Sequence, residues 1–174
     1  MKKFKGVIAA VLAVTMMFSL TACGKKVKRI DDNAIEDAFD DVFGWDDDEY
    51  YEFEDYEQWG TNFDDPDNPH IYELDEYISG SEWDDDEYIH ITFCDFDEVD
   101  EADEYFGEYY GAFGDDTKKN SYKEGRWGYY IEYDEKDRFA AMYFCDDMVL
   151  EVTGVGKDNV KLVKQFLKEL GLPR

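Results

Sequence analysis

The sequence predicts an α+β fold in which helices pack on one face of a largely antiparallel sheet. Three segments carry apolar residues at the spacing of one helix face, and alternating apolar and polar residues between them indicate half-buried strands. Helices with one apolar stripe need an apolar sheet face to cover, which favours this arrangement. The chain has 174 residues, enough for one domain with a sizeable core.

The predicted helices have recognisable ends. They cover about residues 33–43, 98–113 and 159–170. Asn33 and Glu36 have the spacing of a capping box, and Gly44 suits the end of the first helix. Asp97 is the expected N-cap of the second helix, and Asp158 is that of the third.

The predicted strands lie between these helices. They cover residues 50–56, 71–78, 89–93, 129–133, 139–145 and 148–155. Asp146 and Asp147 join the last two strands as a hairpin. The high acid content of residues 50–56 opposes strand formation. If this segment is a strand, the order of elements is helix–βββ–helix–βββ–helix.

Two internal similarities indicate a pseudo-repeat. The segment 45–50, Trp-Asp-Asp-Asp-Glu-Tyr, recurs at residues 83–88. The apolar pattern of residues 89–109, a strand followed by a helix, recurs at residues 150–170. An ancient duplication produces such a match. Two unrelated segments with the same helical spacing of apolar residues also match by chance.

The amino terminus carries the features of an exported lipoprotein. Three lysines precede an apolar run from Val7 to Leu20, which is too short to span about 30 Å of hydrocarbon as a stable helix and fits a secretory signal. The run ends in Leu20-Thr21-Ala22-Cys23, which resembles the lipobox of bacterial prolipoproteins. The resemblance implies cleavage before Cys23 and a diacylglyceryl group on its thiol.

This resemblance implies an order of segments and a location. Residues 1–22 are then a signal peptide, 23–30 a lipidated basic tether, and 31–174 a single acidic α+β domain. The cations of the tether either meet anionic lipid head groups or stay in solvent. Two acyl chains anchor a protein stably, which places the domain on the extracytoplasmic face of the cell membrane. The layout also resembles small uncharacterised lipoproteins of Gram-positive gut bacteria, a likeness that implies no known activity.

The acidic residues are unevenly distributed. The mature chain, without the three lysines of residues 1–22, has 15 cations against 45 acids and a net charge of −30. Residues 30–117 contain 35 acids and no Lys or Arg, whereas residues 118–174 contain 10 acids and 11 bases. This field argues against nucleic acid as a partner. It attracts cations, cationic peptides or basic proteins, or it only keeps the domain soluble.

Two cysteines and two acidic runs are candidates for cross-linking and metal binding. Cys94 and Cys145 either form a disulfide, which persists outside the cytoplasm, or are two buried free thiols. Neither acidic run has the frame of an EF-hand loop. A weak Ca²⁺ site has its expected oxygen ligands in these runs: Asp46, Asp47, Asp48, Asp84, Asp85 and Asp86.

No residue pattern predicts catalysis. The chain lacks a Gly-x-Ser-x-Gly elbow. His70 and His90 lie in different predicted elements and do not indicate a transition-metal site. We therefore expect no enzyme and no cofactor, but a lipid-anchored, non-catalytic binding or interaction module. The alternatives are a Ca²⁺-binding surface protein and a carboxylate-dependent envelope glycan hydrolase.

The expected partners follow from the anchor and the surface. They are the membrane, through the lipid, and a cationic peptide, a basic protein or a glycan; nucleic acid is not expected. Trp45, Trp59 and Trp83 lie in or near acidic segments. These rings either stack on sugar rings or belong to the core.

Overall fold

A computed structural model shows an α+β architecture, which confirms the predicted fold class. The structure describes residues 26–46, 48–59, 71–112 and 121–174. Within these ranges, three helices pack against one seven-stranded antiparallel sheet. The elements in chain order are α2 (Asp32–Phe43), β1 (Tyr50–Trp59), β2 (Ile71–Asp84), β3 (Glu87–Phe96), α3 (Val99–Ala112), β4 (Ser121–Glu124), β5 (Trp127–Asp134), β6 (Arg138–Cys145), β7 (Met148–Val155) and α4 (Lys157–Glu169).

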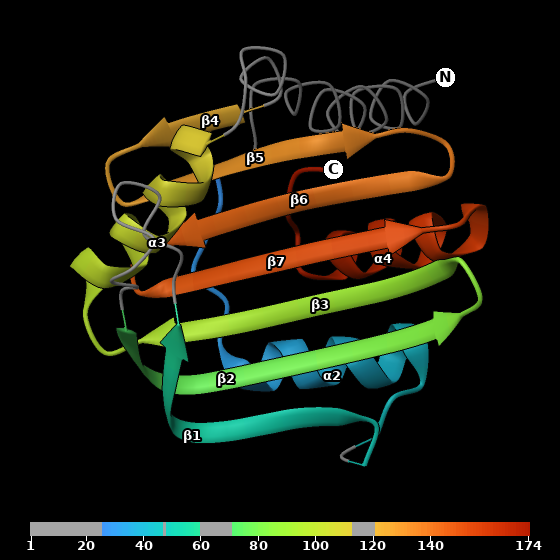
Figure 1. Cartoon of the computed structure of the whole chain (residues 1–174), viewed down its shortest axis with the longest axis horizontal. Helices are drawn as coiled ribbons and strands as arrows, with labels where there is room; N and C mark the ends of the chain where they lie inside the picture. Colours follow the sequence, from blue (N-terminus) through green and yellow to red (C-terminus); the bar gives the residue numbers. More distant parts are fainter. Residues whose placement is uncertain (1–25, 47, 60–70, 113–120) are drawn as a thin grey trace, which may run out of the picture.

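The sheet joins two parts of the chain side by side. Its strand order is β1-β2-β3-β7-β6-β5-β4, and every neighbouring pair is antiparallel. β3 and β7 pair inside the sheet, so the first three strands form one part and the last four form the other (Figure 1). The acidic stretch of sequence therefore supplies the edge strand β1, and the stretch with balanced charge supplies the edge strand β4.

The helices lie on both faces of the sheet, which corrects the expectation of a single covered face. Phe93 belongs to the apolar core under α2 and α4, whereas the next residue, Cys94, belongs to a second core under α3. Successive residues of a strand point to opposite faces, so α3 lies on the face opposite α2 and α4 (Figure 1). The inner strands β6 and β7 are largely buried on both faces. A helix stripe alone does not specify which of two apolar faces it covers.

Most predicted elements are present, with differences at their ends and connections. Asp31, rather than Asn33, caps α2 and accepts a hydrogen bond from a first-turn backbone N–H at 3.0 Å. α4 begins after Gly156 without a side-chain cap, so the N-cap expected at Asp158 is wrong. The strand predicted at residues 50–56 is confirmed as β1, whereas β4 has no counterpart among the predicted strands.

The structure does not confirm the pseudo-repeat. β4 adds a strand, so the order of elements is α–βββ–α–ββββ–α. Matching residues of β3 and β7, such as Ile91 and Val152, face the same core under α4. The helices that follow these strands nevertheless lie on opposite faces. The acidic hexapeptides differ as well, because the first connects α2 to β1 and the second forms the β2–β3 hairpin.

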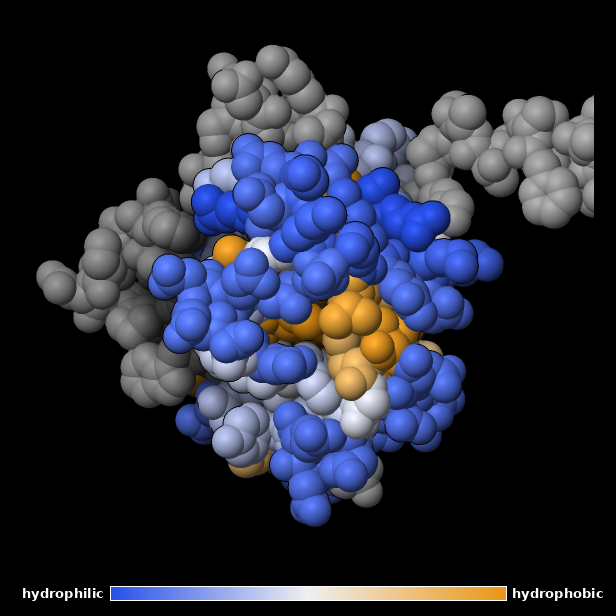
Figure 2. All heavy atoms as spheres, turned by 90° about the vertical axis from the view of Figure 1, so that its right-hand side faces the viewer, coloured by the Kyte–Doolittle hydropathy of each residue, from blue (hydrophilic) through white to orange (hydrophobic). Residues whose placement is uncertain are grey.

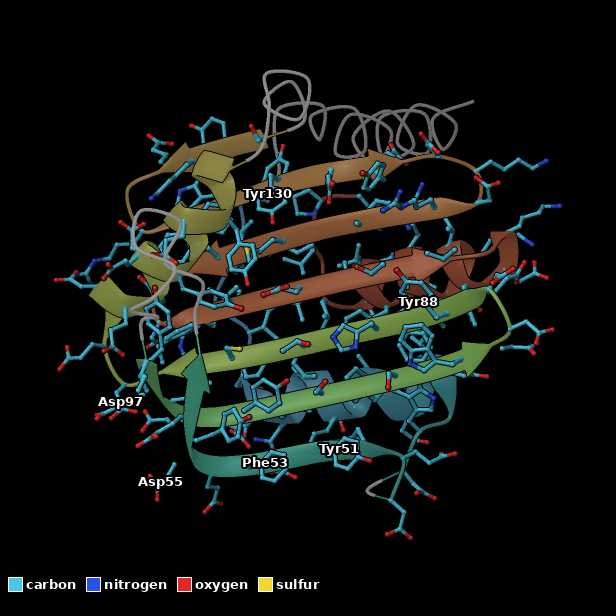
Figure 3. All side chains as sticks on the ribbon, in the orientation of Figure 1. Tyr51, Phe53, Asp55, Tyr88, Asp97 and Tyr130 are labelled. Carbon is cyan, nitrogen blue, oxygen red and sulfur yellow. The ribbon has the colours of Figure 1, made fainter. Side chains whose placement is uncertain are left out.

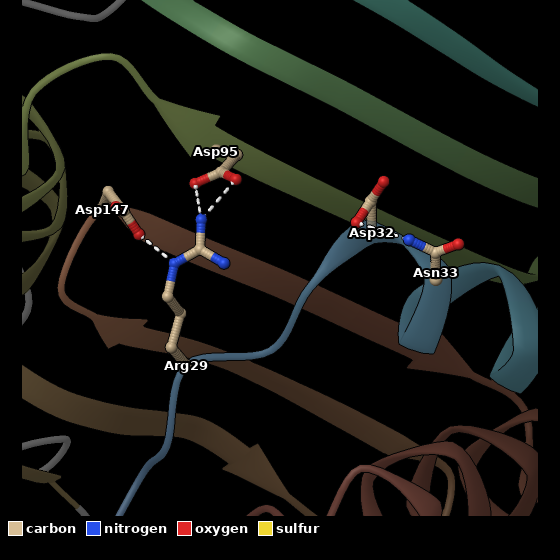
Figure 4. Close-up of polar contacts among 5 residues, drawn as sticks. All are labelled: Arg29, Asp32, Asn33, Asp95 and Asp147. Carbon is tan, nitrogen blue, oxygen red and sulfur yellow. Dashed lines mark hydrogen bonds and ion pairs between the residues drawn. The ribbon is translucent and has the colours of Figure 1, made fainter.

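Residues 27–30, which the sequence assigns to the lipidated basic tether 23–30, pack against the folded domain. Val27 is fully buried and Ile30 is 7% exposed. Arg29 binds Asp95 near the end of β3, with Nη2 2.6 Å from Oδ2, and also pairs with Asp147 in the β6–β7 turn (Figure 4). Two apolar side chains and one guanidinium therefore hold this segment to the sheet.

The lipobox lies outside the described residues. The predicted signal peptide and Cys23 fall within residues 1–25, which the structure does not describe. Lipidation therefore stays a prediction. None of the helices in the described ranges is long and apolar enough to cross a membrane.

Candidate binding face

α3 packs against β3, β6 and β7, and its rings also contact Tyr72 of β2 and Tyr130 of β5. It nevertheless leaves part of this sheet face uncovered, where Tyr51, Phe53 and Trp83 are exposed. Most of the uncovered part of this face consists of side chains from β1, β2 and β3. These side chains alternate along the strands with core residues of the other face, such as Ile78 and Ile89. The strand register brings seven of them together with one residue of β7, Thr153, in a surface that we call the open face: Tyr51, Phe53, Ser79, Ser81, Trp83, Tyr88, His90 and Thr153.

Large aromatic side chains of the open face are exposed. Five large hydrophobic side chains of the described residues are exposed, and three of them belong to the open face: Tyr51 (69%), Phe53 (46%) and Trp83 (64%). Tyr51 and Phe53 follow each other on the same side of β1 (Figure 3). Grouped exposed rings retain apolar area that a partner can bury, so they mark an interaction surface.

Trp83 and Tyr88 form a flat aromatic plate on the open face. They are cross-strand partners in the β2–β3 hairpin. Their rings stack with centroids 4.4 Å apart and planes 18° from parallel. Tyr88 is partly buried, so the more exposed indole is the ring available to a ligand. A second group of rings lies on the same side of the sheet, with centroids 4.7 to 6.3 Å apart: Phe53, Tyr56 and Tyr77.

Uncharged polar groups lie beside these rings. Ser79 pairs with Thr92 and Ser81 with His90 across β2 and β3, and His90 pairs with Thr153 across β3 and β7. His90 Nε2 is 3.2 Å from the hydroxyl oxygen of Thr92. Burial lowers the pKa of His90, which favours the neutral imidazole. The eight residues of the open face include no carboxylate, ammonium or guanidinium group.

The acids of β1 and β2 next to the open face point to the other side of the sheet. Glu52 pairs with Ile78 and Glu82 pairs with Ile89, and both apolar partners belong to the core under α2 and α4. Seen from the end with the β2–β3 turn, the molecule is mostly hydrophilic, with paler and apolar areas between the charged ones (Figure 2). The open face is therefore a neutral, aromatic and hydroxyl-bearing surface on a strongly acidic domain.

A pocket of about 190 Å³ lies where the open face meets α3. Its lining includes Tyr109 of α3, Glu132 of β5, and Glu151 and Thr153 of β7. Burial raises the pKa of Glu151, while the hydroxyl of Tyr105, which donates a hydrogen bond to Oε1 at 2.7 Å, opposes this rise. The pocket is smaller than the roughly 300 Å³ at which ligand pockets usually begin.

Cys94 and Cys145 do not form a disulfide. Both are free and buried. Cys94 lies in the core under α3, whereas Cys145 lies in the core under α2 and α4, so the sheet separates them. Burial raises the pKa of both thiols, that of Cys145 to about 11, and a thiol that stays protonated is a poor nucleophile. Of the two alternatives, buried free thiols are therefore correct.

The acidic runs form local turns. In the first run, Asp46 accepts a hydrogen bond from the Asp48 N–H at 3.1 Å, and Asp47 lies outside the described residues. In the second run, Asp85 has a φ of 52° in the two-residue turn between β2 and β3. The other two residues of this run are exposed: Asp84 and Asp86. Among the residues that the structure describes, no group of three or more His, Cys, Asp or Glu is arranged to hold a metal ion.

The structure separates the tryptophans that were candidates for stacking on sugar rings. Trp83 is exposed on the open face and Trp45 is buried in the core, while the side chain of Trp59 lies outside the described residues. Sequence reasoning missed Glu151, although one acid inside the apolar run of residues 148–155 was a usable signal. It also missed Tyr51, which is exposed because no helix of the described residues covers this part of the face.

The comparisons with protein families, curated proteins and solved structures find no match to this chain. The geometry and chemistry of the open face therefore carry the functional argument.

Proposed function

We propose that the protein is a lipid-anchored, extracytoplasmic binding module whose open face binds a neutral glycan. The observation that carries the proposal is an exposed indole beside rows of hydroxyl groups, with no charged group among the eight residues of the open face, in a chain of formal net charge −27. A pyranose ring has an apolar face of C–H groups and a rim of hydroxyl groups. It therefore complements an aromatic plate and short polar side chains at the same time.

The overall charge favours a cationic partner, but the local chemistry of the open face opposes one. Long-range fields steer encounters, whereas the groups in contact determine which ligand is held. A Lys or Arg side chain on the open face gains a cation–π contact, about 0.5–1 kcal/mol at an exposed site. It has no carboxylate of the open face to pair with, because the neighbouring acids of β1 and β2 point to the other side.

Calorimetric titration with soluble oligosaccharides tests this proposal. The probes are oligomers of β-linked glucose and of N-acetylglucosamine, with a lysine oligopeptide as the cationic comparison. Trp83→Ala removes the exposed indole and is expected to lower the saccharide affinity roughly tenfold, about 1.4 kcal/mol. Tyr122→Ala is the matched control, since Tyr122 is 43% exposed and stacks on Trp127 at 4.7 Å but lies on the opposite face.

Two results of this titration contradict the proposal. One is an equal loss of affinity in Trp83→Ala and Tyr122→Ala, since the open face then has no special part in binding. The other is preferential binding of the lysine oligopeptide, which assigns recognition to the acids instead.

One observation favours a second function, hydrolysis of the bound glycan. Glu132 and Glu151 line one pocket beside the open face, and burial raises the pKa of Glu151, as it does for the general acid of a glycosidase. If this function holds, the protein cuts glycosidic bonds of an oligosaccharide and generates new reducing ends. Glu151→Gln then stops the formation of reducing ends while binding persists. Binding of the saccharide without any new reducing end rejects hydrolysis and leaves the binding role.

A further inference from the structure

The start of the folded domain fixes where an anchor on Cys23 emerges. Val27 is fully buried, and Lys26 lines a pocket of about 410 Å³ together with Glu124 and Arg126 of the β4–β5 hairpin. Lys26 follows Cys23 by three residues, a span of at most ~11 Å. A lipid on Cys23 therefore lies next to the β4–β5 hairpin.

The charge of the sheet changes from one edge to the other. β1, β2 and β3 contain 11 acids and no Lys or Arg, whereas β4, β5, β6 and β7 contain 4 acids and 2 bases. β1 and β4 are the two edge strands of the seven, and six strand spacings of ~4.8 Å place them ~29 Å apart. The anchor emerges near β4, so the acidic edge of the sheet is the distant one.

The β4–β5 edge of the sheet, which we call the near edge because the anchor emerges beside it, also carries groups that suit a lipid surface. Lys26 and Arg126 line the same pocket, and neither has an ion pair among the described residues. Trp127 lines it as well, and Trp is enriched at membrane–water interfaces. Two acids, Glu124 and Asp146, belong to the same lining. The two cations offset these acids and leave the near edge without the large negative excess of the far edge.

We infer that the domain stands on the membrane on its β4–β5 edge, with Lys26 and Arg126 against anionic phospholipid head groups and the β1–β2 edge pointing outward. This inference rests on the proposed anchor at Cys23. Electrostatic screening acts over about 8 Å at physiological ionic strength, so acids ~29 Å from the bilayer are hardly repelled. The same acids laid against the head groups are repelled in full, which disfavours the other orientations.

Energy transfer from the protein to the bilayer tests this orientation. The mature lipoprotein is reconstituted in phosphatidylcholine vesicles, with or without phosphatidylglycerol, that contain a head-group-labelled acceptor lipid. A donor dye is attached at Glu124→Cys on β4 or at Glu54→Cys on β1; the two native thiols of the domain are buried and do not compete. The expected result is higher transfer from position 124 than from position 54, with the larger difference in anionic vesicles.

Charge variants show whether the cations are responsible. Lys26→Gln with Arg126→Gln is expected to remove the additional difference seen in anionic vesicles. Lys157→Gln with Lys168→Gln, which removes two exposed cations of α4, is the matched control and leaves it unchanged. Equal transfer from the two dye positions, or higher transfer from position 54, overturns the inference.

The anchor and the orientation fail in distinguishable ways. The intact mass of the membrane fraction reports whether Cys23 carries acyl groups, and an unmodified thiol rejects the anchor. In that case a maleimide lipid is coupled to Cys23 and the donor dye is carried at position 124 or 54 by an azide-bearing amino acid, so that the two labels react with different groups. The same energy-transfer comparison still confirms or overturns the orientation.

Discussion

Gly80 has a steric role, because the indole of Trp45 occupies the space that a larger side chain at this position of β2 needs. A Cβ atom added at Gly80 lies 2.8 Å from Trp45 Cε3, too close without a shift of the ring. We expect Gly80→Ala to lower the free energy of unfolding by ~1–3 kcal/mol, the usual cost of overpacking a core. Urea denaturation measures this difference.

Gly107 on α3 is the matched control for Gly80. A Cβ atom there meets nothing nearer than the Lys123 Nζ at 4.0 Å. Since alanine is the better helix former, Gly107→Ala is expected to raise the free energy of unfolding by up to ~1 kcal/mol. Changes of the same sign at both positions contradict the steric explanation.

Glu76 on β2 makes stability depend on pH. Burial raises its pKa to about 7, and Glu52 on β1 and Asp32 on α2 add to the rise. The ordinary value of 4.5 applies to the unfolded chain, so between about pH 4.5 and 7 the folded state keeps a proton that the unfolded state releases. The stability that this group contributes is therefore full at low pH and is lost as pH rises through that interval.

The variant Glu76→Gln tests this dependence, because glutamine keeps the shape and does not titrate. Urea denaturation from pH 4 to 8 is expected to show the wild type losing stability relative to Glu76→Gln as pH rises. Glu82→Gln, an exposed change on the same strand, controls for the loss of one charge. A difference between wild type and Glu76→Gln that stays constant with pH rejects the assignment.

Part of the candidate site was predictable at the scale of residues. The alternation of apolar and polar residues in the predicted strand 89–93 places His90 on the face opposite Ile89 and Ile91, and the structure confirms this. It did not distinguish Trp45 from Trp83, since the two hexapeptides are identical and only the surrounding fold buries one of them. The exposure of a ring depends on what the rest of the chain places on it.

At the scale of elements, residues 26–31 before α2 pack across the ends of strands. Arg29 makes the polar contacts of this segment, since it pairs with Asp95 and Asp147 (Figure 4). Arg29→Met keeps the length of the side chain but leaves two carboxylates without their cation. We expect a loss of about 1 kcal/mol in the free energy of unfolding, the upper range for a partly exposed ion pair.

Limited proteolysis adds a local readout to this loss of stability. Arg29→Met is expected to speed cleavage within residues 26–31, whereas Lys28→Met, a change at the exposed neighbouring residue, is not. Equal cleavage rates in the two variants indicate that Val27 and Ile30 hold the segment without help from Arg29.

Elements with a clear apolar period were predictable, and those without one were not. β7, predicted at residues 148–155, has the bounds Met148–Val155. β4, with the sequence Ser-Tyr-Lys-Glu, has one apolar residue and forms because β5 pairs with it. The sheet face that α3 covers could not be predicted from the sequence either, because the sheet has apolar positions on both of its faces.

At the scale of the whole molecule, the sheet separates the two thiols of the domain. Because Cys94 and Cys145 lie in different cores, we expect the midpoint of thermal unfolding to be the same with and without a reductant. Thiol counting in denaturant is expected to find both cysteines reduced. A fall in the midpoint on reduction, together with a mass lower by two hydrogens, contradicts this arrangement.

The uneven charge of the sequence becomes an uneven charge of the molecule through the strand order. The acidic stretch supplies β1, β2 and β3 on one side of the sheet, and the balanced stretch supplies the other side. The sequence showed the asymmetry along the chain. Its direction in space depends on the pairing of β3 with β7, a long-range contact that no local pattern specifies.

Amide chemical-shift mapping tests the central claim, that the open face is the binding surface. The intact protein is titrated with the oligosaccharides used for calorimetry. The account predicts shifts concentrated on the open face, around Ser81, Trp83 and His90, with α2 and α4 unchanged. Shifts confined to α2, α4 or the acidic turns, with the open face unchanged, would contradict it.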